Sequence, residues 1–394
     1  MFDKETSAIP EPTVSAVVPR PRRACRGRVL VAALATVGAL AGGFAFTAPA
    51  SAATGAHGSA AGAAAPAAAT AQIRSQGTWT STGQMPFKTK DGTRATLPGN
   101  GEVLVTGGGA QPQLCAPSTG RWTATGDAGT PKWGTATLLK DGKVLVASTD
   151  GDGHAQLYDP ATRQWTDTGR MSTPLWGEPT ATLLKDGKVL VAGGEDTSSA
   201  QLYDPGTREW KSTSSMSVQR EGATATLLPD GQVLVAGGKD YDGYTRSAEL
   251  YHPSTGTWTA TDDMSSPHGY GTATLLKDGK VLVAGGNTGQ GGPNAAAELY
   301  NPTTKEWTST GTMAQARYWY SATLLPDGRV LVAGGNGSQS STPYTSELYD
   351  PATGTWTDAG RMPANHQGGA SVLLKDGKVL VAGGATTSAD VYTP

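Results

Sequence analysis

The stretch Arg317-Tyr318-Trp319-Tyr320 places a cation directly before three aromatic side chains. Arginine binds carboxylates through paired hydrogen bonds, and aromatic faces stack on sugar rings. Tyrosinate oxygen and imidazole nitrogen are also ligands that copper accepts. Residues of these types therefore suggest either the binding of a carbohydrate or peptide or the coordination of a metal.

Similar residue types recur before a repeated segment, which reads TATLLKDGKVLVAGG in its regular copies. Most of them stand four or two positions upstream of the first residue of that segment. The three tryptophans that lie outside the repeated TWT segments, Trp133, Trp176 and Trp319, are all within four residues of it. The candidate ligand-binding residues are Lys90, Trp133, Trp176, Arg220, His268, Tyr270, Arg317, Tyr318, Trp319 and His366.

The elements that position these residues follow from seven copies of the repeat. An Asp-Gly or Asn-Gly pair between apolar segments is typical of a two-residue hairpin, and the pairs are 41 to 49 residues apart. Each copy contains four short segments, TATLL, KVLVAGG, AELYD and TWT. Four antiparallel strands at this spacing predict one blade of a β-propeller. We therefore predict an all-β, seven-bladed propeller over residues 76–394.

Two incomplete ends of the repeat predict how the ring closes. A TWT segment around Trp79 precedes the first copy, whereas the last copy ends at Pro394 without one. We expect the N-terminal strand to complete the C-terminal blade, which leaves no open sheet edge. Strand alternation then brings the variable loops to one face, with the candidate residues around the mouth of the central channel. The alternative is structural: the arginines hold neighbouring backbone and the aromatics fill the channel.

The Gly-Gly pair after VLVA, the Tyr of LYDP and the Trp of TWT resemble the residues that define kelch repeats. The chain resembles a secreted bacterial kelch protein of the galactose oxidase-like propeller superfamily. Kelch propellers include protein scaffolds, sugar binders and copper radical oxidases, so this resemblance leaves the function open.

The oxidases of that superfamily hold copper at the same face, and their residues match this chain only in part. Tyr270 and Tyr318 stand where tyrosine ligands would be expected, but Trp319 occupies the place of a histidine. An indole N–H has no lone pair for a metal. Cys115 replaces the repeat tyrosine and is expected inside a blade, not at a metal. We therefore disfavour copper and assign no catalytic residue, no metal ligand and no cofactor; Asp150 to His154 is a weak calcium candidate.

The first part of the chain indicates export. Arginines precede an apolar run, and an Ala-x-Ala site follows at 50–52, which predicts a cleaved signal peptide over residues 1–52. The retained anchor and the choice of export route stay open. Residues 53–75 are rich in Ala, Gly and Pro, as in a disordered linker. The predicted location is extracellular, with no membrane contact after cleavage.

Composition narrows the partners. The formal net charge is −2, so no basic field indicates nucleic acid. We expect a monomer that acts as a secreted binding module, whose partner is an extracellular glycan or protein held on the loop-bearing face. The alternative is a relative of galactose oxidase, disfavoured because its ligand set is incomplete.

Overall fold

The computed structural model describes residues 77–394, apart from 127–128, 130, 290–291 and 339–343. The predicted signal peptide (1–52) and linker (53–75) lie outside these residues. The described part of the chain is built of β-strands and turns, without an α-helix. It accordingly contains no helix with the length and apolar character needed to cross a membrane.

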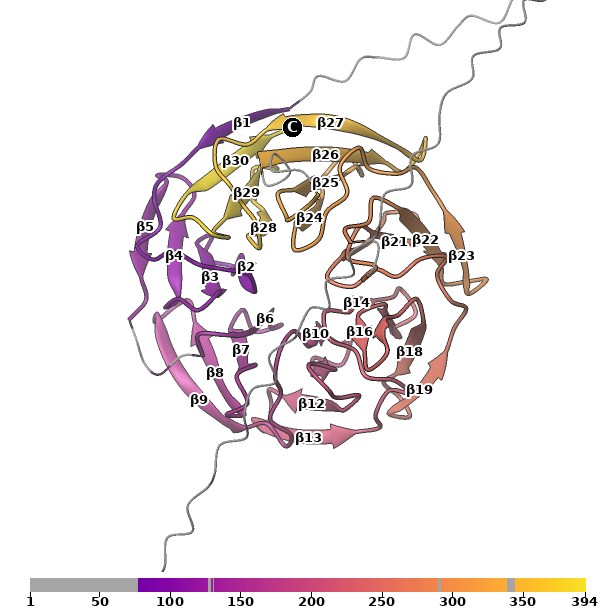
Figure 1. Cartoon of the computed structure of the whole chain (residues 1–394). Helices are drawn as coiled ribbons and strands as arrows, with labels where there is room; N and C mark the ends of the chain where they lie inside the picture. Colours follow the sequence, from indigo (N-terminus) through magenta and orange to yellow (C-terminus); the bar gives the residue numbers. More distant parts are fainter. Residues whose placement is uncertain (1–76, 127–128, 130, 290–291, 339–343) are drawn as a thin grey trace, which may run out of the picture. The chain divides into compact units, whose positions relative to one another are not determined.

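Seven four-stranded antiparallel sheets follow one another around a common centre (Figure 1). The first three blades, each given from its inner to its outer strand, are β2 (Thr93–Thr96), β3 (Val103–Gly107), β4 (Gln113–Ala116) and β5 (Arg121–Ala124); β6 (Gly134–Leu138), β7 (Val144–Ser148), β8 (His154–Asp159) and β9 (Gln164–Arg170); and β10 (Thr180–Leu183), β11 (Val189–Ala192), β12 (Ala200–Asp204) and β13 (Glu209–Thr213). These sheets confirm the predicted all-β, seven-bladed propeller.

The remaining blades have the same order. They are β14 (Thr224–Leu227), β15 (Val233–Ala236), β18 (Ala248–His252) and β19 (Thr257–Ala260); β20 (Thr272–Leu275), β21 (Val281–Ala284), β22 (Ala297–Asn301) and β23 (Glu306–Ser309); β24 (Ser321–Leu324), β25 (Val330–Ala333), β26 (Thr345–Asp350) and β27 (Thr355–Arg361); and β28 (Ala370–Leu373), β29 (Val379–Ala382), β30 (Ala389–Thr393) and β1 (Thr78–Ser81). A small hairpin, β16 (Lys239–Asp240) with β17 (Gly243–Tyr244), extends from blade 4.

The N-terminal strand closes the ring, as predicted. β1 pairs antiparallel with β30, and Trp79 lies opposite Tyr392. The inner strands contact one another in a complete cycle: β2, β6, β10, β14, β20, β24, β28 and again β2. Each sheet therefore has a neighbour on both faces, and the last sheet combines the two ends of the described chain.

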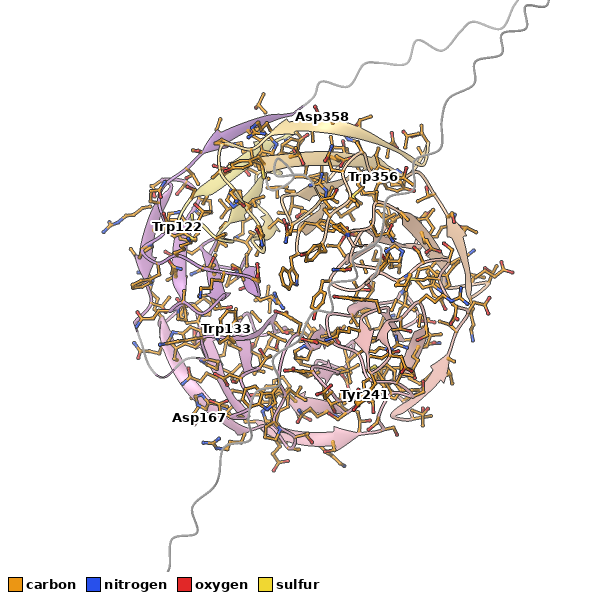
Figure 2. The ribbon with its side chains drawn as sticks, in the orientation of Figure 1. Trp122, Trp133, Asp167, Tyr241, Trp356 and Asp358 are labelled. Atoms are coloured by element: carbon orange, nitrogen blue, oxygen red, sulfur yellow. The ribbon has the colours of Figure 1, made fainter. Side chains whose placement is uncertain are left out.

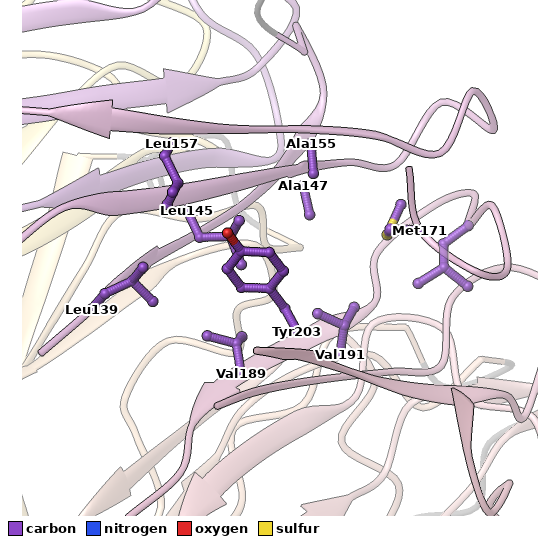
Figure 3. Packing of buried hydrophobic residues seen from close by; sticks show 10 residues of the cluster. Leu139, Leu145, Ala147, Ala155, Leu157, Met171, Val189, Val191 and Tyr203 are labelled. Carbon is purple, nitrogen blue, oxygen red and sulfur yellow. The ribbon is translucent and has the colours of Figure 1, made fainter. Parts of the chain in front are cut away.

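The hydrophobic core lies between neighbouring blades. Tyr203 of blade 3 belongs to one cluster with Leu145 and Leu157 of blade 2, and Figure 3 shows its ring packed among them. Equivalent clusters occupy the other spaces between blades. Since both faces of every sheet are covered, the VLV strands are apolar throughout rather than alternating.

Tryptophans of the outer strands connect the blades at the periphery. Trp258 packs against Tyr251 at 4.9 Å between ring centroids, and its indole N–H donates to the carbonyl of Ser214 in the preceding blade. Trp307 and Trp356 make the same kind of bond across a blade boundary. Figure 2 shows Trp122 and Trp356 in this outer position.

Blade 1 has cysteine in place of the packed tyrosine. Cys115 lies opposite Trp122 and is fully buried, in agreement with the sequence prediction. Burial, followed by the charge of Glu102, raises the pKa of the Cys115 thiol to about 12. The thiol therefore serves as a small packing group.

We predict that Trp79→Ala lowers the free energy of unfolding by about 2–4 kcal/mol, through lost packing and lost hydrogen bonds. The Trp79 indole N–H is 2.9 Å from Ser346 Oγ and 3.1 Å from the Ala359 carbonyl, so it joins blade 7 to blade 6. Chemical denaturation measures the change. Thr80→Ala, an exposed position on the same strand, is the control. Equal stability of the two variants would contradict the role given to Trp79.

Candidate ligand-binding site

The loops after the second strands and the links between blades emerge on one side of the ring, here called the loop face. This follows from the alternating strand directions, with the Asp-Gly turns on the opposite side. The large hydrophobic side chains that are exposed in the described part of the chain, Phe87, Trp133, Trp176 and Tyr241, all belong to these loops and links. Figure 2 shows Trp133 towards the inner end of its blade and Tyr241 farther out.

A cavity of about 210 Å³ lies where the inner strands begin. Its walls come from six of the seven blades, and its larger side chains are Arg94, Glu178, Tyr270, Trp319 and Tyr320. Glycines and short residues at the strand entries form the remainder. The cavity is smaller than a typical drug-sized pocket, so it suits a single small group.

Backbone hydrogen bonds between blades hold much of this entrance together. The Gly222 N–H donates to the Glu178 carbonyl at 2.9 Å, and the Tyr270 N–H donates to the Gly222 carbonyl at 2.7 Å. The series continues with the Trp319 N–H, which donates to the Tyr270 carbonyl, and the Gly368 N–H, which donates to the Trp319 carbonyl. Blades 3 to 7 therefore share one line of peptide bonds around the opening.

Two aromatics on this line adopt a backbone conformation that favours glycine. Gly92, Gly222 and Gly368 occupy the same position of the repeat, one or two residues before their inner strands, with φ of 77°, 63° and 70°. Tyr270 and Trp319 occupy the equivalent positions in blades 5 and 6, with φ of 57° and 51°. Left-handed backbone costs a bulky residue free energy, and such strain concentrates at functional sites. Packing of the fold alone does not require these two side chains, since three blades place glycine there.

The strained aromatics form a cluster. The Tyr270 and Trp319 rings meet edge to face, with centroids 5.4 Å apart and planes at 69°. Tyr244 contacts Tyr270 from one side, at 6.2 Å. Tyr318 contacts Trp319 from the other, at 5.1 Å, and its hydroxyl accepts a hydrogen bond from Asn336. The two rings that line the cavity are thus supported from behind.

Charged groups complete the cavity. Arg94 Nη2 is 2.5 Å from Glu178 Oε2, and both side chains are partly exposed. The Tyr270 hydroxyl hydrogen-bonds to Glu221, which also lies 3.8 Å from the Lys239 ammonium. Burial raises the pKa of Glu221, and burial with the Glu221 charge raises the pKa of Tyr270. The cavity therefore combines aromatic faces with hydrogen-bonding groups but carries little net charge.

The expectation that Arg220 and Arg317 line the opening is wrong, because both are fully buried inside their blades. Arg220 donates to the carbonyls of Gly237 and Ser247 and pairs with Glu249 at 3.1 Å. Arg317 makes the equivalent bonds, including a 2.8 Å contact with Glu347. Their donors are occupied by backbone and carboxylate, as in the structural alternative, so they do not face a ligand.

His268 and His366 are also buried and do not line the opening. Nδ1 of His268 is 2.6 Å from the Gly285 carbonyl, and its Nε2 is 3.2 Å from Glu298. His366 contacts Gly383 and Asp390 in the same way, at 2.8 and 3.0 Å. Copper needs a free nitrogen lone pair, and both nitrogens of each ring are engaged. Within the described ranges no group of histidine, cysteine, aspartate or glutamate is arranged to hold a metal.

The other predicted residues remain at or near the opening. Tyr270 and Trp319 line the cavity, with Tyr318 directly behind. Trp133 and Trp176 are 36% and 56% exposed. Lys90, in the link that precedes blade 1, is also exposed. The weak calcium candidate is engaged locally: Asp150 accepts from Ser148, and Asp152 accepts from the His154 N–H.

A pattern between repeats explains the buried pairs and was available in the sequence. Blades 4 to 7 carry an acid in the third strand, where blades 1 to 3 carry glutamine. The acid occurs only with Arg or His before the inner strand, as in Arg220 with Glu249. Both residue types accept a hydrogen bond from a backbone N–H of the link that follows the repeat methionine, as Glu249 does from Ser217 and Gln201 does from Thr173. The series is Gln113, Gln156, Gln201, Glu249, Glu298, Glu347 and Asp390.

Arg94, Glu178 and Glu221 are functional candidates that were not assigned from the sequence. Arg94 carried a signal, because it stands where most other copies begin the inner strand with Thr or Ser. Glu178 and Glu221 lie in the variable links, where no regular pattern marks them. The tertiary structure brings their carboxylates to the cavity.

A comparison with protein families agrees with part of this architecture. The kelch motif matches residues 224–265 and 268–314, which cover blades 4 and 5. Blades 4 and 5 therefore match the kelch motif. A solved structure found in the comparison is titled a novel fungal alcohol oxidase with catalytic diversity among the AA5 family, in complex with copper. It shares 19% identity, with a TM-score of 0.47 over 81% of this chain and 77% of that one. This degree of similarity says nothing about the activity of the present chain.

A search of curated proteins finds no significant match.

We predict that Glu298→Gln destabilises the protein by about 3 kcal/mol at neutral pH, as expected for breaking a buried pair. Burial opposes ionisation of Glu298, but bonds from His268, Ser265 and Ser266 lower its pKa to about 2. An ionised native carboxylate contributes stability above the unfolded-state pKa, and this contribution is lost as pH falls towards 2.

The stability difference between wild type and Glu298→Gln should therefore narrow as pH is lowered from about 6 to 3. Urea denaturation at several pH values measures it. Glutamine is accepted at this position in blades 1 to 3, so the substitution fits the site. Glu306→Gln, exposed on the same blade, is the control. A stability difference between wild type and Glu298→Gln that does not change with pH would contradict an ionised, paired Glu298 in the folded protein.

We predict that Trp319→Gly is more stable than Trp319→Ala by about 1 kcal/mol. Both variants lose the ring, so their comparison isolates the cost of the left-handed backbone. The same pair of substitutions at Trp176, which has no positive φ, should favour alanine. Thermal and chemical denaturation test this. Equal or greater stability of Trp319→Ala would contradict backbone strain at this position.

Proposed function

We propose that this kelch propeller is a binding module that receives a carbohydrate at the central opening of the loop face. The observation that carries the proposal is the pair of strained aromatics, Tyr270 and Trp319, at positions where glycine suffices for the fold. A residue kept at a cost to stability is expected to serve another purpose.

The chemistry of the opening favours a sugar over other small ligands. Aromatic faces accept the C–H face of a sugar ring, and the Arg94–Glu178 pair offers both donors and acceptors to hydroxyl groups. A carboxylate-bearing ligand is less well supported, because Arg220 and Arg317 are buried and Arg94 is already paired.

The oxidase alternative is supported less well than binding. The residues that would supply copper ligands do not fit: Trp319 has no lone pair to offer, and both ring nitrogens of His268 and His366 are engaged. We accordingly propose no copper and no other cofactor, and we keep the extracellular location as part of the proposal.

A glycan array followed by isothermal titration calorimetry with the identified sugar tests the proposal. We expect Trp319→Ala to weaken binding about tenfold or more, which corresponds to loss of one stacking contact. Tyr241→Ala is the matched control, since Tyr241 is an aromatic of the same face but 86% exposed and outside the cavity. It should bind as the wild type does.

Three outcomes would contradict the proposal. The first is binding that persists unchanged in a folded Trp319→Ala variant. The second is an array without any bound glycan, together with capture of a protein ligand by the loop face. The third is stoichiometric copper with peroxide formation from an alcohol or aldehyde, which would establish the oxidase alternative.

A further inference from the structure

We infer that the ligand is an uncharged oligosaccharide that extends from the central cavity across blades 1 to 3, with Trp133 and Trp176 as two further stacking subsites. This inference rests on the proposed function and goes beyond it, since a single sugar in the cavity would not need either tryptophan.

The first support is the distribution of tryptophan. Seven of the ten belong to the outer strands, where they pack blades together. The other three, Trp133, Trp176 and Trp319, lie at the entries of inner strands on the loop face. Trp319 lines the cavity, whereas Trp133 and Trp176 are 36% and 56% exposed. Both indoles are thus held at the loop face with part of each ring open to a ligand.

The second support is the construction of each subsite. The Trp176 ring rests on the backbone of Gly151 in the preceding blade, where a Cβ would come within 1.9 Å of the ring. Trp133 rests in the same way on Gly109, where a Cβ would lie 2.9 Å from the ring. Tyr270 of the cavity rests on Gly222, where a Cβ would lie 2.4 Å from the ring. Each ring is thus supported on one side by a neighbouring blade. A supported ring loses little conformational entropy when a ligand stacks on it.

The third support is continuity with the cavity. Gly92 lines the cavity, and a Cβ there would lie 2.9 Å from Glu178 Oε1 and 3.6 Å from the Trp133 ring. Trp133 therefore borders the cavity at the side of the Arg94–Glu178 pair. Trp176 precedes Glu178 by two residues and pairs through its backbone with Asp150. Glu178 therefore lies close to Trp133 in space and to Trp176 along the chain; the surface from Trp176 past Glu178 and Trp133 to the cavity is called the path below.

Charge along this path decides the class of ligand. The path carries the carboxylates of Asp91, Asp150 and Glu178 and the cations Lys90 and Arg94, of which Arg94 is paired with Glu178, so it has no excess of positive charge for an acidic ligand. Burial, and then the Glu178 charge, raise the pKa of Asp91, while Lys90 opposes this shift. Carboxylates accept hydrogen bonds from hydroxyl groups. Separate aromatic platforms with carboxylates between them suit sugar rings, whereas a protein interface has a contiguous apolar centre.

Isothermal titration calorimetry with two neutral series, the cello-oligosaccharides and the chito-oligosaccharides from monosaccharide to hexasaccharide, tests the inference. In the series that binds, we expect affinity to rise about tenfold or more from monosaccharide to tetrasaccharide. Trp133→Ala and Trp176→Ala should each weaken tetrasaccharide binding severalfold and leave monosaccharide binding unchanged. Tyr241→Ala is the control for a general effect of removing an exposed aromatic.

The outcomes separate this inference from the proposed function. Binding that depends on Trp319 but not on chain length would overturn the oligosaccharide path and leave the cavity as a sugar site. Tighter binding of oligogalacturonides than of either neutral series would overturn the assignment of an uncharged ligand. Absence of binding in both series, with no glycan bound on the array, would overturn the proposed function and the inference together.

Discussion

The face-to-face packing of seven small sheets is the constraint on which the rest of the structure depends. A four-stranded sheet of this size has two apolar faces and cannot be stable alone, so each blade requires a neighbour on both sides. Pairing of β1 with β30 gives the last blade its outer strand and closes the cycle. Once the ring is closed, the seven inner strands begin at one place. Residues that are far apart in the sequence then share a single opening.

The same repeat that builds the ring provides an internal comparison for each position. Glycine before the inner strand in blades 1, 4 and 7 shows what the backbone accepts there without strain. Tyr270 and Trp319 depart from that standard, and they do so side by side. Conversely, Arg220, His268, Arg317 and His366 vary in type but perform one structural task, which is to hold a buried acid and the first carbonyl of the Gly-Gly pair. Variation between copies therefore marks function only when the side chain is also accessible.

The corrected positions of the arginines change the chemistry expected of a ligand. With Arg220 and Arg317 at the opening, an acidic ligand would be favoured; with both buried, the cavity presents aromatic faces and the Arg94–Glu178 pair. The exposed aromatics belong to links and loops, which the closed scaffold holds in fixed relation. A rigid ring with variable loops on one face is a common arrangement for binding sites.

The sequence by itself determined the number of blades, the ring closure through Trp79, the burial of Cys115 and the face on which variable residues gather. Those features follow from periodicity and turn chemistry, which are local and repeat along the chain. The tertiary structure alone decided which candidates reach the opening. Arg317 and Trp319 are two residues apart, yet one points into its blade and the other into the cavity. Their separation depends on the left-handed turn at Trp319 and on the acid of a strand about thirty residues away, which no local pattern specifies.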